Sequence, residues 1–187
     1  MSNSKITELT ALTTPASADL IPIVDDTDTT TKKITYGSLL TALTTDLYGA
    51  LVKRIVKVTT ETVNNSTTLQ DDDELTFSIG ASEKWAFNMC LIYRSGTTPD
   101  FKLQWSLPSG CSIFYQQDDV AEAAFTEVDN YTISGAGAST SSIASFYGVI
   151  LNGSTAGNIT LQWAQAVQNA SDTKVMAGSY IIATKLS

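Results

Sequence analysis

The chain has 187 residues, of which 43% are hydrophobic and 16% are charged, and its formal net charge is −8. This length suits one domain of ordinary size with an appendage, and the apolar fraction is large enough for a buried core. The negative charge opposes binding to phosphates, which proteins contact mainly through clustered Lys and Arg, so no nucleic-acid partner is expected. No apolar run approaches the roughly 20 residues that span a bilayer, so no membrane association is expected.

The sequence contains no histidine, which removes the usual general base and the usual zinc ligand. Cys90 and Cys111 are the only cysteines. They are too few for a disulfide framework or a four-thiol metal site, and we interpret them as reduced thiols that pack as small apolar groups. The sequence therefore predicts no catalytic residue, no metal site and no cofactor, and the protein is not expected to be an enzyme.

Acidic residues gather in three short runs, which we interpret as solvated turns. Glycoside hydrolysis needs two carboxylates that face each other across a cleft, and clustering along the sequence is poor support for that geometry. A calcium ion shared between subunits by residues 71–74 is a further possibility. The acidic residues of the three runs are Asp25, Asp26 and Asp28; Asp71, Asp72, Asp73 and Glu74; and Asp118, Asp119 and Glu122.

Residues 1–36 lack helical periodicity and predict an extended N-terminal arm. The apolar run at residues 20–24 contains Pro22, which removes a hydrogen-bond donor and suits an edge strand. Asp and Thr side chains in residues 25–30 favour a turn, because they hydrogen-bond to nearby backbone groups. Residues 32–36 resume an extended form. A two-stranded arm with an acidic turn follows from this pattern.

Residues 37–52 predict one short amphipathic helix, because Leu39, Leu43, Leu47 and Leu51 recur every four residues. Its threonines lower its intrinsic helix propensity, so the helix should need packing partners. The leucine stripe can cover the base of the following domain, or it can meet identical stripes of neighbouring subunits around a symmetry axis. The sequence alone favours neither alternative.

Residues 53–187 are rich in β-branched and aromatic residues in short stretches with turn signals between them. The spacing predicts a mainly β fold, a jelly-roll-like β-sandwich preceded by the arm and the helix. Large and small residues alternate over residues 85–93, as in a strand whose heavier face points inward. The predicted strands are residues 54–63, 74–79, 85–94, 101–107, 112–116, 144–151, 159–166 and 179–185.

Six aromatic residues of this domain allow two interpretations. They can stack against sugars if several are exposed, or they can form the core. The core is favoured, because the repeated triplet Leu-Gln-Trp at residues 103–105 and 161–163 places each Trp within a strand pattern. The six are Trp85, Trp105, Trp163, Tyr93, Tyr115 and Phe114.

The segments ITEL (6–9), DLIPIVD (19–25) and TKKITY (31–36) resemble an N-terminal module of phage tail fibres, head fibres and other virion proteins. Pieces of the later region are also similar to phage structural proteins. The resemblance covers most of the chain, and it implies a trimeric, β-rich projection attached to the particle through its N-terminal region. The later pieces are NNSTTL (64–69), DELTF (73–77), WAF (85–87), DFK (100–102), LQWAQ (161–165) and GSYIIATK (178–185).

On this basis we expect a capsid decoration (cement) or head-fibre protein in the virion, which is assembled in the cytoplasm of the bacterial host. The expected partners are the major capsid protein or another virion protein, and two further copies in a homotrimer. The alternative is a tail-fibre or tail-tip module that recognises a glycan or protein of the host surface. The expected anchoring residues are Ile6, Leu9, Leu20, Ile21 and Ile23, and the expected subunit contacts are Leu39, Leu43 and Leu47.

Overall fold

The computed structural model describes residues 14–24, 31–118, 125–126 and 130–187. The chain divides into two compact units, Met1–Ala50 and Leu51–Ser187.

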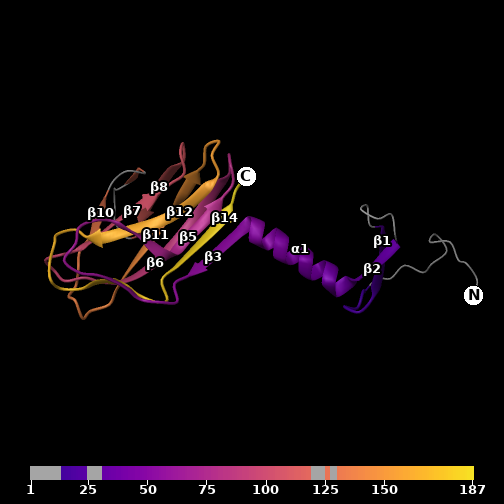
Figure 1. The fold of residues 1–187 in the computed structure, drawn as a ribbon, viewed down its shortest axis with the longest axis horizontal. Helices are drawn as coiled ribbons and strands as arrows, with labels where there is room; N and C mark the ends of the chain where they lie inside the picture. Colours follow the sequence, from indigo (N-terminus) through magenta and orange to yellow (C-terminus); the bar gives the residue numbers. More distant parts are fainter. Residues whose placement is uncertain (1–13, 25–30, 119–124, 127–129) are drawn as a thin grey trace, which may run out of the picture. The chain divides into compact units, whose positions relative to one another are not determined.

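The N-terminal unit contains a hairpin and a helix. Strands β1 (Leu20–Val24) and β2 (Thr31–Thr35) pair antiparallel, with Leu20 opposite Thr35, and α1 (Tyr36–Leu51) follows directly (Figure 1). The hydroxyl oxygen of Thr35 accepts a hydrogen bond from the backbone N–H of Ser38 at 3.0 Å, which caps the first turn of α1. The predicted two-stranded arm and the predicted helix are both present, with boundaries that differ by about one residue.

Residues just before the hairpin contact the start of α1. The backbone N–H of Gly37 donates to the carbonyl oxygen of Ser17 at 2.9 Å, and that of Tyr36 donates to the carbonyl of Asp19 at 2.7 Å. A Cβ atom at position 37 would lie 2.9 Å from the Ser17 carbonyl oxygen, so glycine permits this close approach. Backbone hydrogen bonds therefore hold residues 17–19 against the start of α1.

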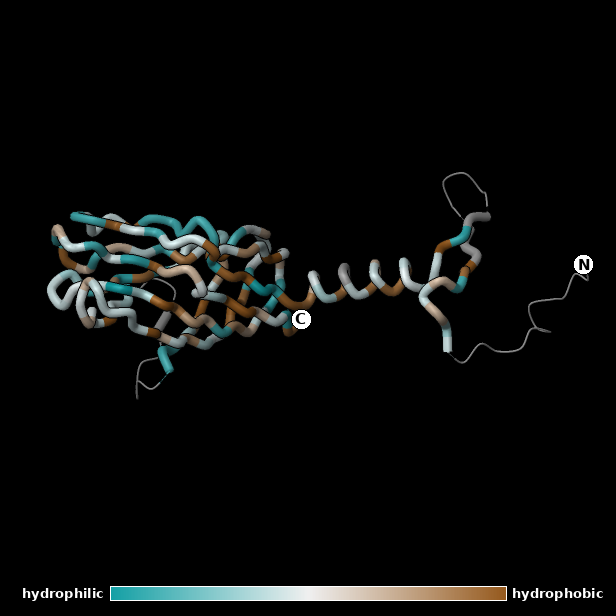
Figure 2. Tube along the Cα trace, turned by 90° about the horizontal axis from the view of Figure 1, so that it is seen from below, coloured by the Kyte–Doolittle hydropathy of each residue, from teal (hydrophilic) through white to brown (hydrophobic). Residues whose placement is uncertain are grey.

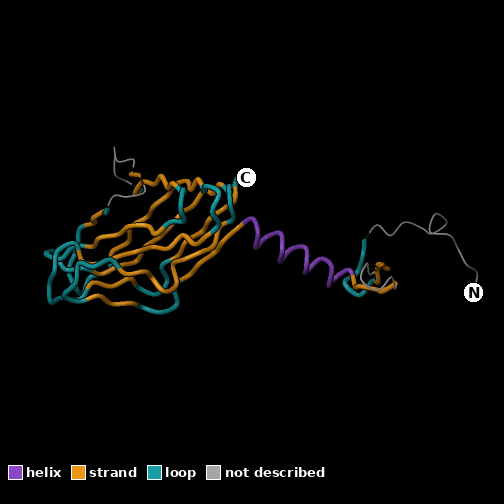
Figure 3. Tube along the Cα trace, turned by 45° about the horizontal axis from the view of Figure 1, so that its top comes forward, coloured by secondary structure: helices purple, strands orange, loops and turns teal. Residues whose placement is uncertain are grey.

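The C-terminal unit, hereafter the β domain, is a sandwich of two antiparallel sheets, with loops at the ends of the strands (Figure 3). The smaller sheet has the order β10 (Tyr131–Ile133), β7 (Phe101–Ser106), β12 (Gly157–Gln165), β5 (Gln70–Ile79). The main order of the larger sheet is β3 (Val52–Val56), β14 (Tyr180–Lys185), β6 (Lys84–Arg94), β11 (Ser142–Leu151), β8 (Ser112–Gln117), β9 (Phe125–Thr126). Off this path, β13 (Thr173–Val175) pairs with both β6 and β4 (Glu61–Val63).

Aromatic side chains from both sheets fill the space between them. Phe87 of β6 contacts Trp105 of β7 edge-on with ring centroids 5.5 Å apart. Phe101 of β7 stacks on Trp163 of β12 at 5.6 Å, and Tyr93 of β6 lies 5.3 Å from Phe101. These contacts bury large apolar areas and set the separation of the sheets.

The core interpretation of the aromatic residues is confirmed at five of the six positions. Phe114 is the exception, because it lies on the outward face of β8 and is 44% exposed. The residues confirmed in the core are Trp85, Trp105, Trp163, Tyr93 and Tyr115. Of the two thiols, Cys111 is buried and Cys90 is half-buried, and neither forms a disulfide.

The mainly β class and the sandwich are confirmed, and each predicted strand overlaps an observed one. The finer jelly-roll description stays a prediction. The single strand predicted over residues 54–63 is wrong, because β3 ends at Val56 and β4 begins at Glu61. The turn interpretation of residues 71–74 is also wrong, because these residues lie within β5.

Candidate interaction surfaces

Helix α1 carries an uncovered apolar stripe. Leu40, Leu43 and Leu47 are 46%, 56% and 60% exposed, and Tyr48 and Leu51 are also exposed. Positions 40, 43 and 47 follow the three-then-four spacing of a coiled-coil seam, and apolar positions recur along α1 in Figure 2. A helix of 16 residues with such a stripe gains most of its stability from packing against another surface.

Two of the three expected subunit contacts, Leu43 and Leu47, belong to this stripe, and the third, Leu39, is half-buried. Leu40, rather than Leu39, lies on the exposed side of α1 with Leu43 and Leu47. The four-residue spacing used in the sequence does not distinguish Leu39 from Leu40, whereas the alternation of three and four residues does.

The expected anchoring residues are only partly within the described structure. Leu20 is 56% exposed and Ile21 is half-buried, both in β1. Ile6 and Leu9 lie outside the described residues, and so does the side chain of Ile23. Their role as anchors stays a prediction.

The outward faces of the two sheets of the β domain differ sharply in chemistry. The smaller sheet points polar residues outward: Ser78, Lys102, Gln104, Thr160 and Gln162. The larger sheet points many apolar residues outward among polar and basic ones, and we call its outward surface on β3, β14, β6, β11 and β8 the apolar face. Its polar and basic residues include Arg54, Lys84, Asn88, Arg94, Gln116 and Ser145. Exposed large apolar residues of this face are Val56, Phe114, Ile143, Tyr147, Val149, Leu151, Tyr180 and Ile182.

The apolar residues of this face are interrupted by polar ones across the strands. Tyr147 of β11 lies opposite Asn88 of β6 and Gln116 of β8, while the next outward residue, Val149, lies opposite Phe114. A shallow groove of about 500 Å³ runs over β6, β11 and β8 and is lined mainly by apolar surface from these strands. An exposed apolar patch of this kind marks an interaction site in a folded protein.

The apolar face is also free of negative charge. The five strands that form it contain no Asp or Glu, although the chain has 19 acidic residues. The basic residues Arg54, Lys84 and Arg94 do point outward on this face, so it carries positive charge. Lys185, which pairs with Glu83 at 2.7 Å, and Lys53, which lies 5.8 Å from the centre of the Trp85 ring, are on the inward side of their strands.

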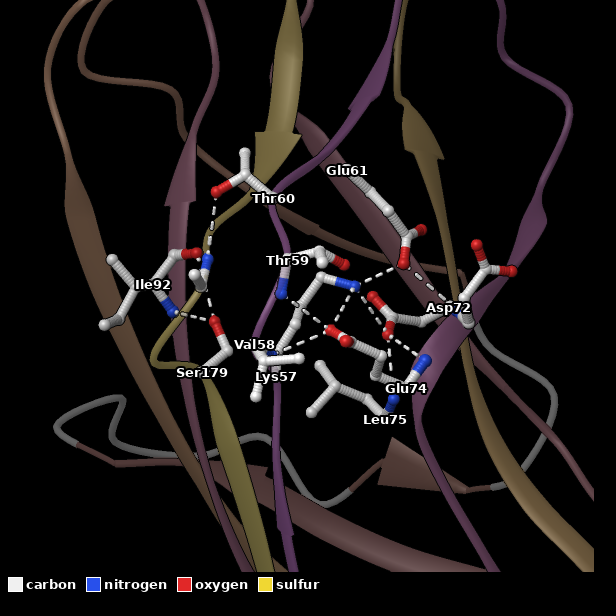
Figure 4. Close-up of polar contacts among 12 residues, drawn as sticks. Lys57, Val58, Thr59, Thr60, Glu61, Asp72, Glu74, Leu75, Ile92 and Ser179 are labelled. Atoms are coloured by element: carbon white, nitrogen blue, oxygen red, sulfur yellow. Dashed lines mark hydrogen bonds and ion pairs between the residues drawn. The ribbon is translucent and has the colours of Figure 1, made fainter.

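A buried lysine surrounded by three carboxylates closes the side of the sandwich where the edge strands β3 and β5 meet. Lys57 follows β3, and its side chain is fully buried. Its Nζ donates to Glu61 and to Asp72 Oδ1, the latter at 2.9 Å, and lies 3.7 Å from Glu74 Oε2 (Figure 4). Glu61 belongs to β4, while Asp72 and Glu74 belong to β5, so the cluster ties the two sheets together.

Backbone donors hold two of these carboxylates in place. Asp72 Oδ1 also accepts the N–H groups of Glu74 and Leu75 at 3.0 and 2.8 Å. Glu74 Oε2 accepts the N–H groups of Val58 and Thr59 at 2.9 and 3.1 Å. The bonds to Glu74 satisfy backbone N–H groups between the end of β3 and the start of β4, and those to Asp72 satisfy N–H groups within β5.

The cluster shifts the pKa values of Lys57 and Glu74. Burial alone would lower the pKa of Lys57, but its hydrogen bonds and ion pairs with Glu61 and Asp72 outweigh burial and raise that pKa. The N–H groups of Thr59 and Val58, together with the charge of Lys57, lower the pKa of Glu74. Lys57 is thus held as an ammonium ion, which is neither a nucleophile nor a base.

The acidic run at residues 71–74 is therefore engaged in structural contacts. Asp72 and Glu74 face Lys57, and Asp71 Oδ1 accepts from the side-chain amide of Gln162 at 2.7 Å. Within the described residues, no three side chains of His, Cys, Asp or Glu form a group that could hold a metal ion. The arrangement supports a structural role for this run.

Sequence reasoning missed both the apolar face and the role of Lys57. The signal for the face is present in β11, whose sequence SIASFYGVIL is apolar at outward as well as inward positions. Such a run departs from the alternation expected of a strand with one face in water. Lys57 carries no comparable signal, because its partners lie up to 17 positions further along the chain.

Comparisons with known proteins identify no family. No family model matches the chain, and no curated protein matches its sequence.

Among the helices of the described residues, none has the length and apolarity needed to cross a membrane.

Some solved structures show a distant likeness. The tripod (BppUct-A-L) from the baseplate of bacteriophage Tuc2009 is 13% identical over 99% of this chain and 82% of that one, with a TM-score of 0.30. The VP2 protein of infectious bursal disease virus, in T=1 particles of a D431N mutant, is 9% identical with a TM-score of 0.26. That match covers 90% of this chain but only 44% of VP2. TM-scores this low do not establish a shared fold.

The Lys57 cluster predicts a large difference between two neighbouring aspartates. Asp72→Ala should lower the free energy of unfolding by about 3–5 kcal/mol, because it removes a buried partner of Lys57 and leaves two N–H groups unpaired. Asp71→Ala, at an exposed position of the same strand, should cost only about 0.5 kcal/mol. Urea denaturation of both variants measures this, and equal losses would contradict the structural role of the cluster.

The lowered pKa of Glu74 predicts a loss of stability in acid. A carboxylate whose folded-state pKa is depressed stabilises the fold above its unfolded-state pKa, here about 4.5, and this contribution disappears as the pH falls through the folded-state value. Thermal melting of wild type should therefore drop more steeply below about pH 4.5 than melting of Glu74→Gln. Parallel curves for the two proteins would show that Glu74 makes no such contribution.

Proposed function

We propose that this chain is a non-enzymatic structural protein of a bacteriophage particle, a capsid decoration or head-fibre protein attached through its N-terminal unit. The observation that carries the proposal is the contrast between the two units. The described part of the N-terminal unit leaves Leu20, Leu40, Leu43 and Leu47 exposed, whereas the β domain buries a core of its own. A unit that cannot cover its apolar residues needs a partner surface.

The N-terminal unit has the form of an attachment element. Its hairpin presents the exposed Leu20, and its helix presents Leu40, Leu43 and Leu47. An extended hairpin offers backbone groups for strand addition and apolar side chains for pockets of a partner. The expected anchors Ile6, Leu9, Leu20, Ile21 and Ile23 all precede α1.

The β domain, in contrast, is stabilised by its own core. Its core draws on both sheets and includes Cys111, and its buried Lys57 is placed for ion pairing. With no histidine in the chain, the usual proton-transfer group of hydrolases is lacking. The domain therefore acts as a stable outer body rather than as a catalyst.

The proposed mechanism is mechanical. The arm packs against the major capsid protein or another virion protein, and Leu43 and Leu47, with Leu40 beside them, join copies of the chain into a homotrimer. Three weak arms on one trimer give an avidity that a single arm lacks. Assembly takes place in the host cytoplasm, and the finished particle carries the β domain outward.

A tail-fibre or tail-tip receptor-binding module is the second candidate. The observation that favours it is the groove on the apolar face, where Phe114 and Tyr147 lie close to the amides of Asn88 and Gln116. Aromatic rings and amides together suit a sugar or a protein loop of the host. The mostly apolar lining of the groove fits protein contacts better than a polar sugar.

Deletion of the residues before Thr35 tests the anchoring claim. Particles that lack the protein should bind the full chain but not the truncated chain, while circular dichroism shows the same β-sheet spectrum for both. Leu20→Asp should weaken binding, whereas Leu186→Asp, at a similarly exposed leucine of the β domain, should bind like wild type. Undiminished binding of the truncated chain would contradict the proposal.

A further inference from the structure

The apolar face combines an apolar centre with basic residues at its borders. Tyr147 of β11 lies beside Asn88 of β6, and the groove over β6, β11 and β8 is lined mainly by carbon. The basic residues are Arg54 on the edge strand β3, Lys84 at the first position of β6 and Arg94 at its last position. An apolar centre within a polar or charged rim is the usual anatomy of a protein interface.

The charge of this face differs from that of the chain as a whole. The chain has 19 acidic and 11 basic residues, yet the five strands of the face contain no Asp or Glu. Asp118, directly after β8, lies at one border, and Glu83, directly before β6, pairs with Lys185. The smaller sheet carries exposed Asp71 and Asp73 on β5. The apolar face is therefore a positively charged surface on a protein that is acidic overall.

We propose that the apolar face docks an acidic surface of another protein, whose apolar side chain enters the groove while its Asp or Glu residues meet Arg54 and Lys84. The inference deepens the second candidate function, recognition of a host protein, because it assigns the chemistry of that partner. It rests on that candidate function, and the anchoring role proposed for the N-terminal unit is independent of it.

The groove suits an apolar side chain of the partner. Its lining combines the small residues Ala86 and Gly148 with the larger Phe114, Tyr147 and Val149, all three of which are exposed. Small residues between large ones leave a depression into which one side chain can pack. An aromatic or branched side chain in this depression removes apolar surface of both partners from water, which favours binding.

The basic residues select the charge of the partner. Lys84 is the outward residue next to Ala86 along β6, so it borders the groove. Arg54 lies opposite Ile182 of β14, which lies opposite Asn88. Arg54 is therefore two strands from the groove, or about 10 Å at the usual strand spacing. Carboxylates of a partner are attracted by these charges, whereas a basic surface is repelled.

The same features disfavour two other occupants. A second copy that docked through this face would add a second set of the same basic residues, and the strands offer no carboxylate to offset them. An anionic polysaccharide would match the basic residues but would leave the carbon-lined groove without an apolar partner. An acidic protein surface with an exposed apolar side chain matches both the centre and the rim.

Binding of synthetic polymers to the immobilised full chain tests the proposal. Poly(Glu,Tyr) carries carboxylates and aromatic side chains, poly-Glu carries carboxylates alone, and dextran sulfate is an anionic sugar polymer. Biolayer interferometry should show poly(Glu,Tyr) bound about tenfold more tightly than the other two, because only this probe also fills the groove. Added salt should weaken this binding, because it screens the basic residues.

Matched variants locate the binding on the apolar face. Lys84→Gln and Lys102→Gln each remove one positive charge, the first beside the groove and the second on the smaller sheet. Lys84→Gln should weaken poly(Glu,Tyr) binding by about threefold to tenfold, whereas Lys102→Gln should bind like wild type.

A second pair of variants tests the apolar contact. Tyr147→Ser should weaken binding of poly(Glu,Tyr) but not of poly-Glu, whereas Val167→Ser, at an exposed loop position, should change neither. Ile182→Ser, at another exposed position of the face, should act like Tyr147→Ser, and it takes its place if thermal melting shows that Tyr147→Ser is misfolded.

Three results would overturn the proposal. They are a wild-type chain that does not bind poly(Glu,Tyr), equal binding of dextran sulfate, and poly(Glu,Tyr) binding that Lys84→Gln and Tyr147→Ser leave unchanged. The virion role is judged separately, by particle binding of the N-terminal truncation. A chain that binds particles but not poly(Glu,Tyr) would therefore keep the virion role and lose the docking site.

Discussion

Packing of aromatic side chains between the two sheets is the interaction on which the rest of the structure depends. Phe101, Trp163, Phe87 and Trp105 fill the space between the sheets, so the β domain is stabilised from within. The apolar residues that remain outside this core, on α1 and on the larger sheet, are therefore not needed to hold the domain together. Their exposure is the physical reason for assigning them to partners.

The Lys57 cluster fixes the position of β5 against the opposite sheet and adds little net free energy of folding. Burying a lysine and the carboxylate of Asp72 is costly, and their attraction offsets this only because each makes further hydrogen bonds. The cluster joins the segment that follows β3 to the edge strand β5 of the opposite sheet. It gives the first strand of the β domain one fixed position against the opposite sheet.

Much of the fold follows from the sequence, because strong periodicity reports on which side of a strand is buried. The alternation over residues 85–93 predicts β6 with its heavier side chains inward, and the structure agrees. The three-residue strands β10 and β13 are too short to show a period and are not predicted, and β4 is merged with β3 in the strand predicted over residues 54–63.

The exposed apolar surfaces are predicted less well than the strands, for two different physical reasons, and their roles in binding stay predictions. In α1, the choice between Leu39 and Leu40 depends on the helix period, which a four-residue spacing approximates poorly. In β11, apolar residues at outward positions resemble those of any buried strand, so only the structure shows that nothing in the described chain covers Tyr147. The partners of Lys57 depend on long-range pairing that local patterns do not reveal.

Electron microscopy of intact particles labelled with an antibody to the β domain distinguishes a position on the head from one on the tail. Label at regular positions on the head of the particle is expected. Label confined to the tail would favour the receptor-binding alternative, and particles without label would contradict a virion role altogether.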